Sequence, residues 1–193
     1  MVILEFDNLM GKGHRWPLTQ DIVARIPKYA PKLTALNRST QRRFIIKDSD
    51  RRDDDCMMDI IEYLITGELP AVVHMRLTGS RDDTQRLLQL CNVAVALGVT
   101  DFADKVGGEL AAQTSLDVRS FCHVAYECCA ARSYMDVSAK APVGKWLRKY
   151  IATHLSQLEA GRHVREITEK GGKLAGILVE VLMEERKKGG SGR

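Results

Sequence analysis

The segment from Leu87 to Leu97 constrains the fold of this chain more than any other. Ser80 and Asp83 precede it at the spacing of a capping box, in which two side chains satisfy the first free amide groups of a helix. Apolar residues surround the expected helix almost completely, so the helix has no face suited to water. We therefore expect a buried, central helix over residues 80–98, inside a domain with a sizeable core.

A second helix is predicted between Asp53 and Gly67. The three acidic residues 53–55 favour a helix start, because the helix dipole is positive there, and Gly67 suits a helix end. The apolar residues then recur at spacings of three and four: Met57, Ile60, Ile61, Leu64 and Ile65. This spacing predicts one core-facing stripe. Similar stripes between residues 100 and 182 predict further helices.

Short strands are predicted in the first 50 residues instead. Residues 1–6 alternate in polarity, and residues 14–16 and 44–46 fit two more strands. Short helices are expected between them, from Thr19 towards Ile26 and from Pro31 towards Leu36. A region rich in strands followed by a run of helices predicts the α+β class, with an all-α helical extension.

Composition excludes several protein classes. The chain has 193 residues, of which 45% are hydrophobic and 28% charged, as expected for a globular protein and not for a disordered one. No segment approaches the roughly 18 uncharged apolar residues of a membrane span, and acidic residues near the start do not suit a signal peptide. Five cysteines without framework spacing indicate reduced thiols, and hence a cytoplasmic or nuclear protein.

The sequence resembles the BTB/POZ domain family in three segments: residues 44–48, residues 60–69 with the motif Tyr-Leu-Ile-Thr-Gly, and residues 87–102. The resemblance implies a small sheet covered by helices over residues 1–113. We expect a carboxy-terminal helical extension over residues 114–185 and a flexible basic tail over residues 186–193. Members of this family dimerise, tetramerise or bind cullin scaffolds of ubiquitin ligases.

No set of residues in the sequence suggests catalysis or metal binding. Cys122, His123, Cys128 and Cys129 are residue types that bind zinc, but one straight helix cannot bring all four together, so we interpret the cysteines as core residues. Cys56 follows three aspartates, which oppose formation of a thiolate. Phosphate-binding glycine motifs are also missing. We expect no enzyme, no cofactor and no metal.

The function predicted on these grounds is a protein–protein interaction module. It would act as an adaptor or scaffold that binds a cullin or a second copy of itself, and recruitment of substrates to a ubiquitin ligase is one specific version. A nucleic-acid-associated regulator is the alternative. It would use the basic run of Arg38, Arg42, Arg43, Lys47, Arg51 and Arg52, although aspartates interleave with these residues and argue against a phosphate-binding stripe.

Three residues of the helix over 55–66 form the candidate partner surface. At about 100° per residue, Asp59 and Tyr63 lie opposite the core face centred on Met57, Ile61 and Leu64, and Met58 lies at its margin. An exposed aromatic beside charged residues is typical of an interface anchor. The alternative is that Tyr63 is a core residue, covered by the carboxy-terminal helices.

Overall fold

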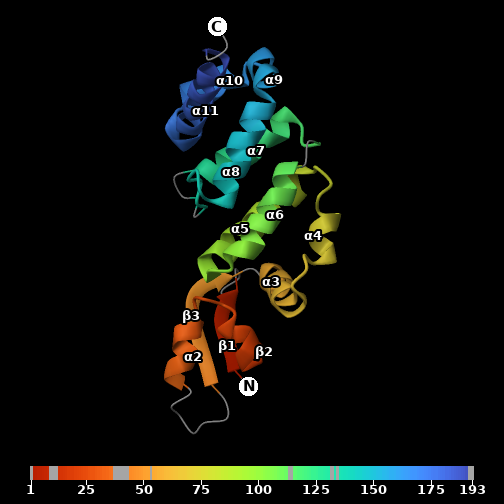
Figure 1. The fold of residues 1–193 in the computed structure, drawn as a ribbon, viewed down its shortest axis with the longest axis vertical. Helices are drawn as coiled ribbons and strands as arrows, with labels where there is room; N and C mark the ends of the chain where they lie inside the picture. Colours follow the sequence, from red (N-terminus) through yellow and green to blue (C-terminus); the bar gives the residue numbers. More distant parts are fainter. Residues whose placement is uncertain are drawn as a thin grey trace. The chain divides into compact units, whose positions relative to one another are not determined.

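The computed structural model of the chain describes residues 2–8, 13–36, 44–52, 54–112, 115–130, 133 and 135–190. The chain divides into two compact units, coloured by sequence in Figure 1. Unit 1 is drawn from Met1–His74 and Gln89–Lys105, and unit 2 from Met75–Leu88 and Val106–Arg193. The predicted domain boundaries at residues 113 and 185 stay predictions.

Unit 1 contains a three-stranded sheet of β1 (Val2–Asn8), β2 (Gly13–Leu18) and β3 (Phe44–Arg52), in the order β2-β1-β3. The central strand β1 pairs antiparallel with β2, with Val2 opposite Leu18. It pairs in parallel with β3, with Val2 opposite Phe44. The three strands predicted from the sequence are therefore confirmed as elements (Figure 1).

The α+β class predicted from the sequence is wrong, because the structure is mainly helical. The three strands hold 7, 6 and 9 residues, whereas α5 and α11 alone hold 17 and 19. Among the described side chains, Val2 and Leu18 are the buried core residues from strands, and almost all others come from helices. Helix packing thus builds the core, and the sheet is a minor part and not the layer that a BTB/POZ-like α+β fold requires.

Capping residues mark where two helices of unit 1 begin or end. In α1 (Gln20–Ala24), the Thr19 hydroxyl accepts a hydrogen bond from the Ile22 amide at 3.4 Å. The short α2 (Ala30–Leu36) follows. The predicted helix of the second apolar stripe is α3 (Asp54–Thr66), and it ends at Gly67, whose φ of 76° suits glycine. The short α4 (Ala71–Met75) comes next.

The central helix predicted over residues 80–98 is confirmed as α5 (Arg81–Leu97). The Ser80 hydroxyl accepts from the Asp83 amide at 3.1 Å, which caps the helix as predicted. The reciprocal half of the capping box is not made, because the Asp83 carboxylate accepts from the Ser80 hydroxyl at 2.7 Å and the Ser80 amide donates to Thr78. The buried residues of α5 include Leu87, Leu90 and Leu97, as the sequence required. Gly98, with φ of 81°, turns the chain into α6 (Thr100–Ala112).

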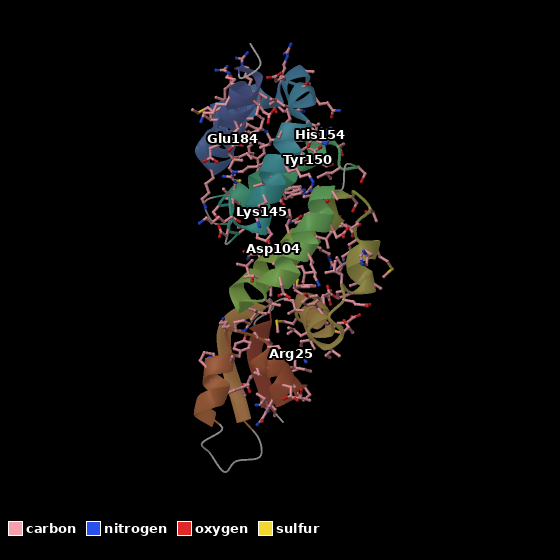
Figure 2. The ribbon with its side chains drawn as sticks, in the orientation of Figure 1. Arg25, Asp104, Lys145, Tyr150, His154 and Glu184 are labelled. Carbon is pink, nitrogen blue, oxygen red and sulfur yellow. The ribbon has the colours of Figure 1, made fainter. Side chains whose placement is uncertain are left out.

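Unit 2 is completed by α7 (Val118–Cys129), α8 (Pro142–Thr153), α9 (Leu155–Ala160), α10 (His163–Lys170) and α11 (Gly172–Gly190). Aromatic rings join α7 to α8, because Phe121 stacks on Tyr150 with centroids 3.9 Å apart. The Tyr150 hydroxyl donates to the Leu116 carbonyl at 2.6 Å. Figure 2 shows Tyr150 and His154 towards one end of α8. None of the helices traced here combines the length and apolar character that a membrane span needs.

Candidate interaction surface on α3

One side of α3 remains in contact with solvent and carries two large apolar residues. Met58 is 56% exposed and Ile65 is 60% exposed. Asp55 and Glu62 are exposed too, and at about 100° per residue all four residues fall within one arc of about 80°. We name Asp55, Met58, Glu62 and Ile65 the α3 stripe. The helix contains no basic residue, so the stripe combines apolar and purely acidic character.

The expectation that Asp59 and Tyr63 face solvent is wrong. Asp59 is 6% exposed and Tyr63 is 5% exposed, whereas Met58 is exposed. The reason is that α3 is covered over a wider arc than its apolar stripe alone indicates, with Phe102 of α6 lying 4.7 Å from Tyr63 between ring centroids. The alternative that Tyr63 is a core residue is confirmed, although α6 and not the carboxy-terminal extension supplies this neighbour.

Tyr63 is held by a polar contact that sequence spacing could not reveal. Its hydroxyl donates to Asp101 Oδ2 at 2.7 Å, and Lys105 Nζ lies 4.8 Å from the centre of its ring. Asp101 and Lys105 both come from the first half of α6, which is distant from α3 in sequence. These contacts place the tyrosine in the packing of unit 1 and leave the α3 stripe as the exposed surface.

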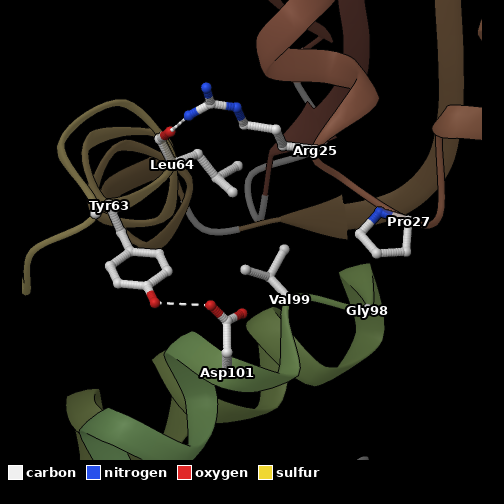
Figure 3. Close-up of a pocket in the computed structure, with 8 residues that line it drawn as sticks. Arg25, Pro27, Tyr63, Leu64, Gly98, Val99 and Asp101 are labelled. Atoms are coloured by element: carbon white, nitrogen blue, oxygen red, sulfur yellow. Dashed lines mark hydrogen bonds between the residues drawn. The ribbon is translucent and has the colours of Figure 1, made fainter.

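A cavity of about 370 Å³ opens beside the end of α3 (Figure 3). It is lined by residues of the α1–α2 turn, the end of α3 and the start of α6: Arg25, Pro27, Tyr63, Leu64, Gly67, Gly98, Val99 and Asp101. This volume is at the low end of the range of ligand pockets, roughly 300–1,000 Å³. The lining includes one carboxylate, that of Asp101, which accepts the hydrogen bond from Tyr63, and neither a histidine nor a cysteine.

The two charged residues that line this cavity, Arg25 and Asp101, both make hydrogen bonds to residues of α3. Arg25 Nη1 donates to the Leu64 carbonyl at 2.5 Å, as the dashed line in Figure 3 shows, and Lys105 Nζ donates to the Gly67 carbonyl at 3.4 Å. The last carbonyls of a helix lack partners within the helix and carry partial negative charge, so cations stabilise them. We therefore interpret the cavity as part of the capping structure of α3.

Unit 2 has a smaller cavity of about 180 Å³ around Trp146, Tyr150 and His154. The His154 ring stacks on Tyr150 at 4.2 Å between centroids, and its Nδ1 lies 3.3 Å from Gln157 Oε1. The cavity is below the size of ordinary ligand sites. Its histidine is engaged with neighbouring side chains, which fits packing better than catalysis.

The thiols of the chain are buried and poorly suited to act as nucleophiles. Burial raises the pKa of Cys91 and Cys128 to about 12, and that of Cys122 and Cys129 to about 11. All five cysteines are reduced and buried, as predicted for core residues. His123 is instead exposed on α7, 3.1 Å from a Glu127 oxygen. Within the described part of the chain, no three His, Cys, Asp or Glu residues form a metal-binding group.

The basic run of the alternative function is only partly covered by the structure. Arg38, Arg42 and Arg43 lie outside the described residues. Lys47, Arg51 and Arg52 belong to β3, whose side chains are outside the described set as well. Nucleic-acid binding by residues 38–52 therefore stays a prediction.

Comparison of the chain with models of known protein families, with curated protein sequences and with solved structures finds no match. The resemblance to BTB/POZ proteins rests on the three sequence segments alone, and the fold class that it implied is not the one observed. The function is therefore argued from the exposed side chains of this chain.

Proposed function

We propose that this protein is a protein–protein interaction module, acting as an adaptor or scaffold, and that the α3 stripe is its contact surface. The observation that carries the proposal is the exposure of Met58 and Ile65. More than half of each residue is accessible to solvent, and the acidic Glu62 lies between them in the sequence. Full burial of a methionine or isoleucine side chain is worth about 1.5–3 kcal/mol. Covering both with a partner therefore supplies a driving force for association.

The chemistry of the buried groups supports this role over catalysis. Burial raises the pKa of four of the five thiols, and both charged residues that line the larger cavity are hydrogen-bonded to α3. An exposed methionine also suits a contact surface, because its flexible, polarizable side chain adapts to a partner's shape. The acidic residues of the α3 stripe favour a partner with basic groups around an apolar centre. A cullin and a second copy of the chain are the first two candidates.

The test compares two variants that place glutamate at exposed apolar positions, two glutamates in the α3 stripe and one in the control. Met58→Glu combined with Ile65→Glu removes the apolar part of the α3 stripe, and Met75→Glu, at a residue 68% exposed, is the matched control. We expect the double variant to lose captured partners in a pull-down quantified by mass spectrometry, and to keep its melting temperature within a few degrees. Purified cullin and tagged copies of the chain are assayed in parallel. Unchanged capture by the folded double variant would contradict the proposal.

A further inference from the structure

α11 carries a second exposed apolar surface, and its charge is opposite to that of α3. Val179 is 48% exposed and Met183 is 55% exposed, while Leu178 and Val181 on the other side are buried. One turn further on, Arg186 and Lys187 are exposed on the side of Met183. We name Val179, Met183, Arg186 and Lys187 the α11 stripe.

The acidic residues of α11 do not offset this positive charge. Glu180 Oε2 lies 2.6 Å from Arg148 Nη2, and Glu185 Oε1 lies 2.7 Å from Lys188 Nζ. Glu184 is rotated by about 100° from Met183 around the helix. Among the residues that the structure describes, neither Arg186 nor Lys187 forms an ion pair, so both charges are available to an acidic partner.

We propose that copies of this chain associate head to tail, with the α3 stripe of one copy against the α11 stripe of the next. The inference rests on the proposed function and names its partner as a second copy. Each stripe has two large apolar residues and two charges of one sign, acidic on α3 and basic on α11. At about 1.5 Å per residue, the α3 stripe spans about 15 Å from Asp55 to Ile65 and the α11 stripe about 12 Å from Val179 to Lys187, so the surfaces differ in length by about one helical turn or less.

An antiparallel arrangement of the two helices satisfies both charge and shape. With Met58 opposite Met183, a step of three residues brings Asp55 opposite Arg186. A step of seven in the other direction brings Ile65 opposite Gly176, where a Cβ would meet nothing within 4 Å, which leaves room for the isoleucine. A parallel pairing with Met58 opposite Met183 would bring Glu62 opposite Lys187, but it would place Asp55 opposite Glu180, which Arg148 engages, and Ile65 opposite Gly190 at the end of α11.

The symmetry of this contact determines what assembles. Two different surfaces meet, so a pair of copies keeps one unused α3 stripe and one unused α11 stripe, and the assembly grows into chains or rings. One pair of helices buries less than the roughly 1,600 Å² of a standard interface, so we expect weak association, with a dissociation constant on the order of 100 µM. Exposed charges contribute, so added salt should weaken association further.

The experiment is sedimentation velocity on the full chain, from about 5 to about 500 µM, at low and high salt. Asp55→Arg with Glu62→Arg reverses the α3 stripe, and Arg186→Glu with Lys187→Glu reverses the α11 stripe. Each variant alone should associate at least ten times more weakly than the wild type. Glu109→Lys, a reversal at an exposed residue of α6, is the control and should associate like the wild type.

Mixing gives the decisive result. The intact α11 stripe of the first variant fits the intact α3 stripe of the second, and the two reversed stripes fit each other. An equimolar mixture should therefore recover association and grow beyond a dimer as the concentration rises. The chain with all four substitutions should associate again. A wild type that is monomeric at 500 µM, or a mixture that stays monomeric, would overturn the head-to-tail contact. Circular dichroism checks that each variant is folded.

The two proposals can fail separately. If the wild type does not self-associate but Met58→Glu with Ile65→Glu still abolishes capture of another protein, the head-to-tail inference is overturned and the α3 stripe remains a contact surface. If capture is unchanged as well, both are overturned. Loss of self-association in both reversed variants, with recovery on mixing, supports both.

Discussion

Substitution of Tyr63 is the strongest single test of the contacts that stabilise unit 1. Tyr63→Phe removes only the hydroxyl that donates to Asp101 at 2.7 Å, and leaves the ring against Phe102. A hydrogen bond to a charged group contributes about 1.5–3 kcal/mol, and exposure of Asp101 to water places this one at or below the lower end, about 1–1.5 kcal/mol. Tyr63→Ala also removes a buried ring and should cost about 3–5 kcal/mol.

The assay is urea unfolding followed by far-UV circular dichroism. With a slope of about 2 kcal/mol per molar urea, Tyr63→Phe should lower the midpoint by about 0.5–0.75 M. A double-mutant cycle with Asp101→Ala isolates the contact, and we expect a coupling energy of about 1 kcal/mol. Met58→Ala is the control on the exposed side of α3 and should change stability by less than about 0.5 kcal/mol. A coupling below about 0.3 kcal/mol, or a Tyr63→Ala variant as stable as the wild type, would refute the packing described for Tyr63.

Two further predictions concern glycines and a helix cap. Gly98 has φ of 81°, and a Cβ there would lie 2.8 Å from Pro27 Cβ, so Gly98→Ala should lower the free energy of unfolding by about 2 kcal/mol or more. Gly108 lies within α6 with open space around it, so Gly108→Ala should raise the free energy of unfolding by about 0.5–1 kcal/mol. Both changes are measured in the same urea assay. Asp117 accepts from the Arg119 and Ser120 amides at 3.0 Å, and Asp117→Ala should cost about 1 kcal/mol at pH 7. Hydrogen bonding to Ser120 lowers the pKa of Asp117 below its ordinary 3.8, so this stabilisation is present above pH 3.8 and is lost as the pH falls through the lowered pKa. Wild type and variant should therefore converge in stability in strong acid, and a difference that persisted there would contradict the capping role.

Local features of the fold were predictable because neighbouring residues determine them. Capping of α5 by the Ser80 hydroxyl, the end of α3 at Gly67 and the burial of α5 follow from spacing within one helix, and the structure confirms all three. The fold class was not predictable in this way. Three short strands predict a sheet that forms one layer of the core, but most of the buried side chains that the structure describes come from helices. Only tertiary packing decides which elements supply the core.

The error at Asp59 and Tyr63 has the same origin. A helical wheel assigns one face to the core, and Met57, Ile61 and Leu64 are buried as it predicts. Helix α3 is nevertheless covered from a further side, by Phe102 and the Asp101 carboxylate, which stand about forty residues away in sequence. Spacing within α3 holds no information on that contact, although Met58 at the margin of the wheel is exposed.

The contacts that bury Tyr63 also bear on the α3 stripe. Arg25 and Lys105 hold the last carbonyls of α3, and the Tyr63–Asp101 bond joins the same turn to α6. Two elements distant in sequence, α1 and α6, therefore fix the end of a helix whose other side is exposed. Because the stripe sits on a helix fixed in this way, a partner does not have to order it on binding, and less of the binding free energy is lost to conformational entropy. A weak contact with two apolar residues and two charges can still be specific, because the positions of Met58, Glu62 and Ile65 relative to one another are already fixed in the unbound chain.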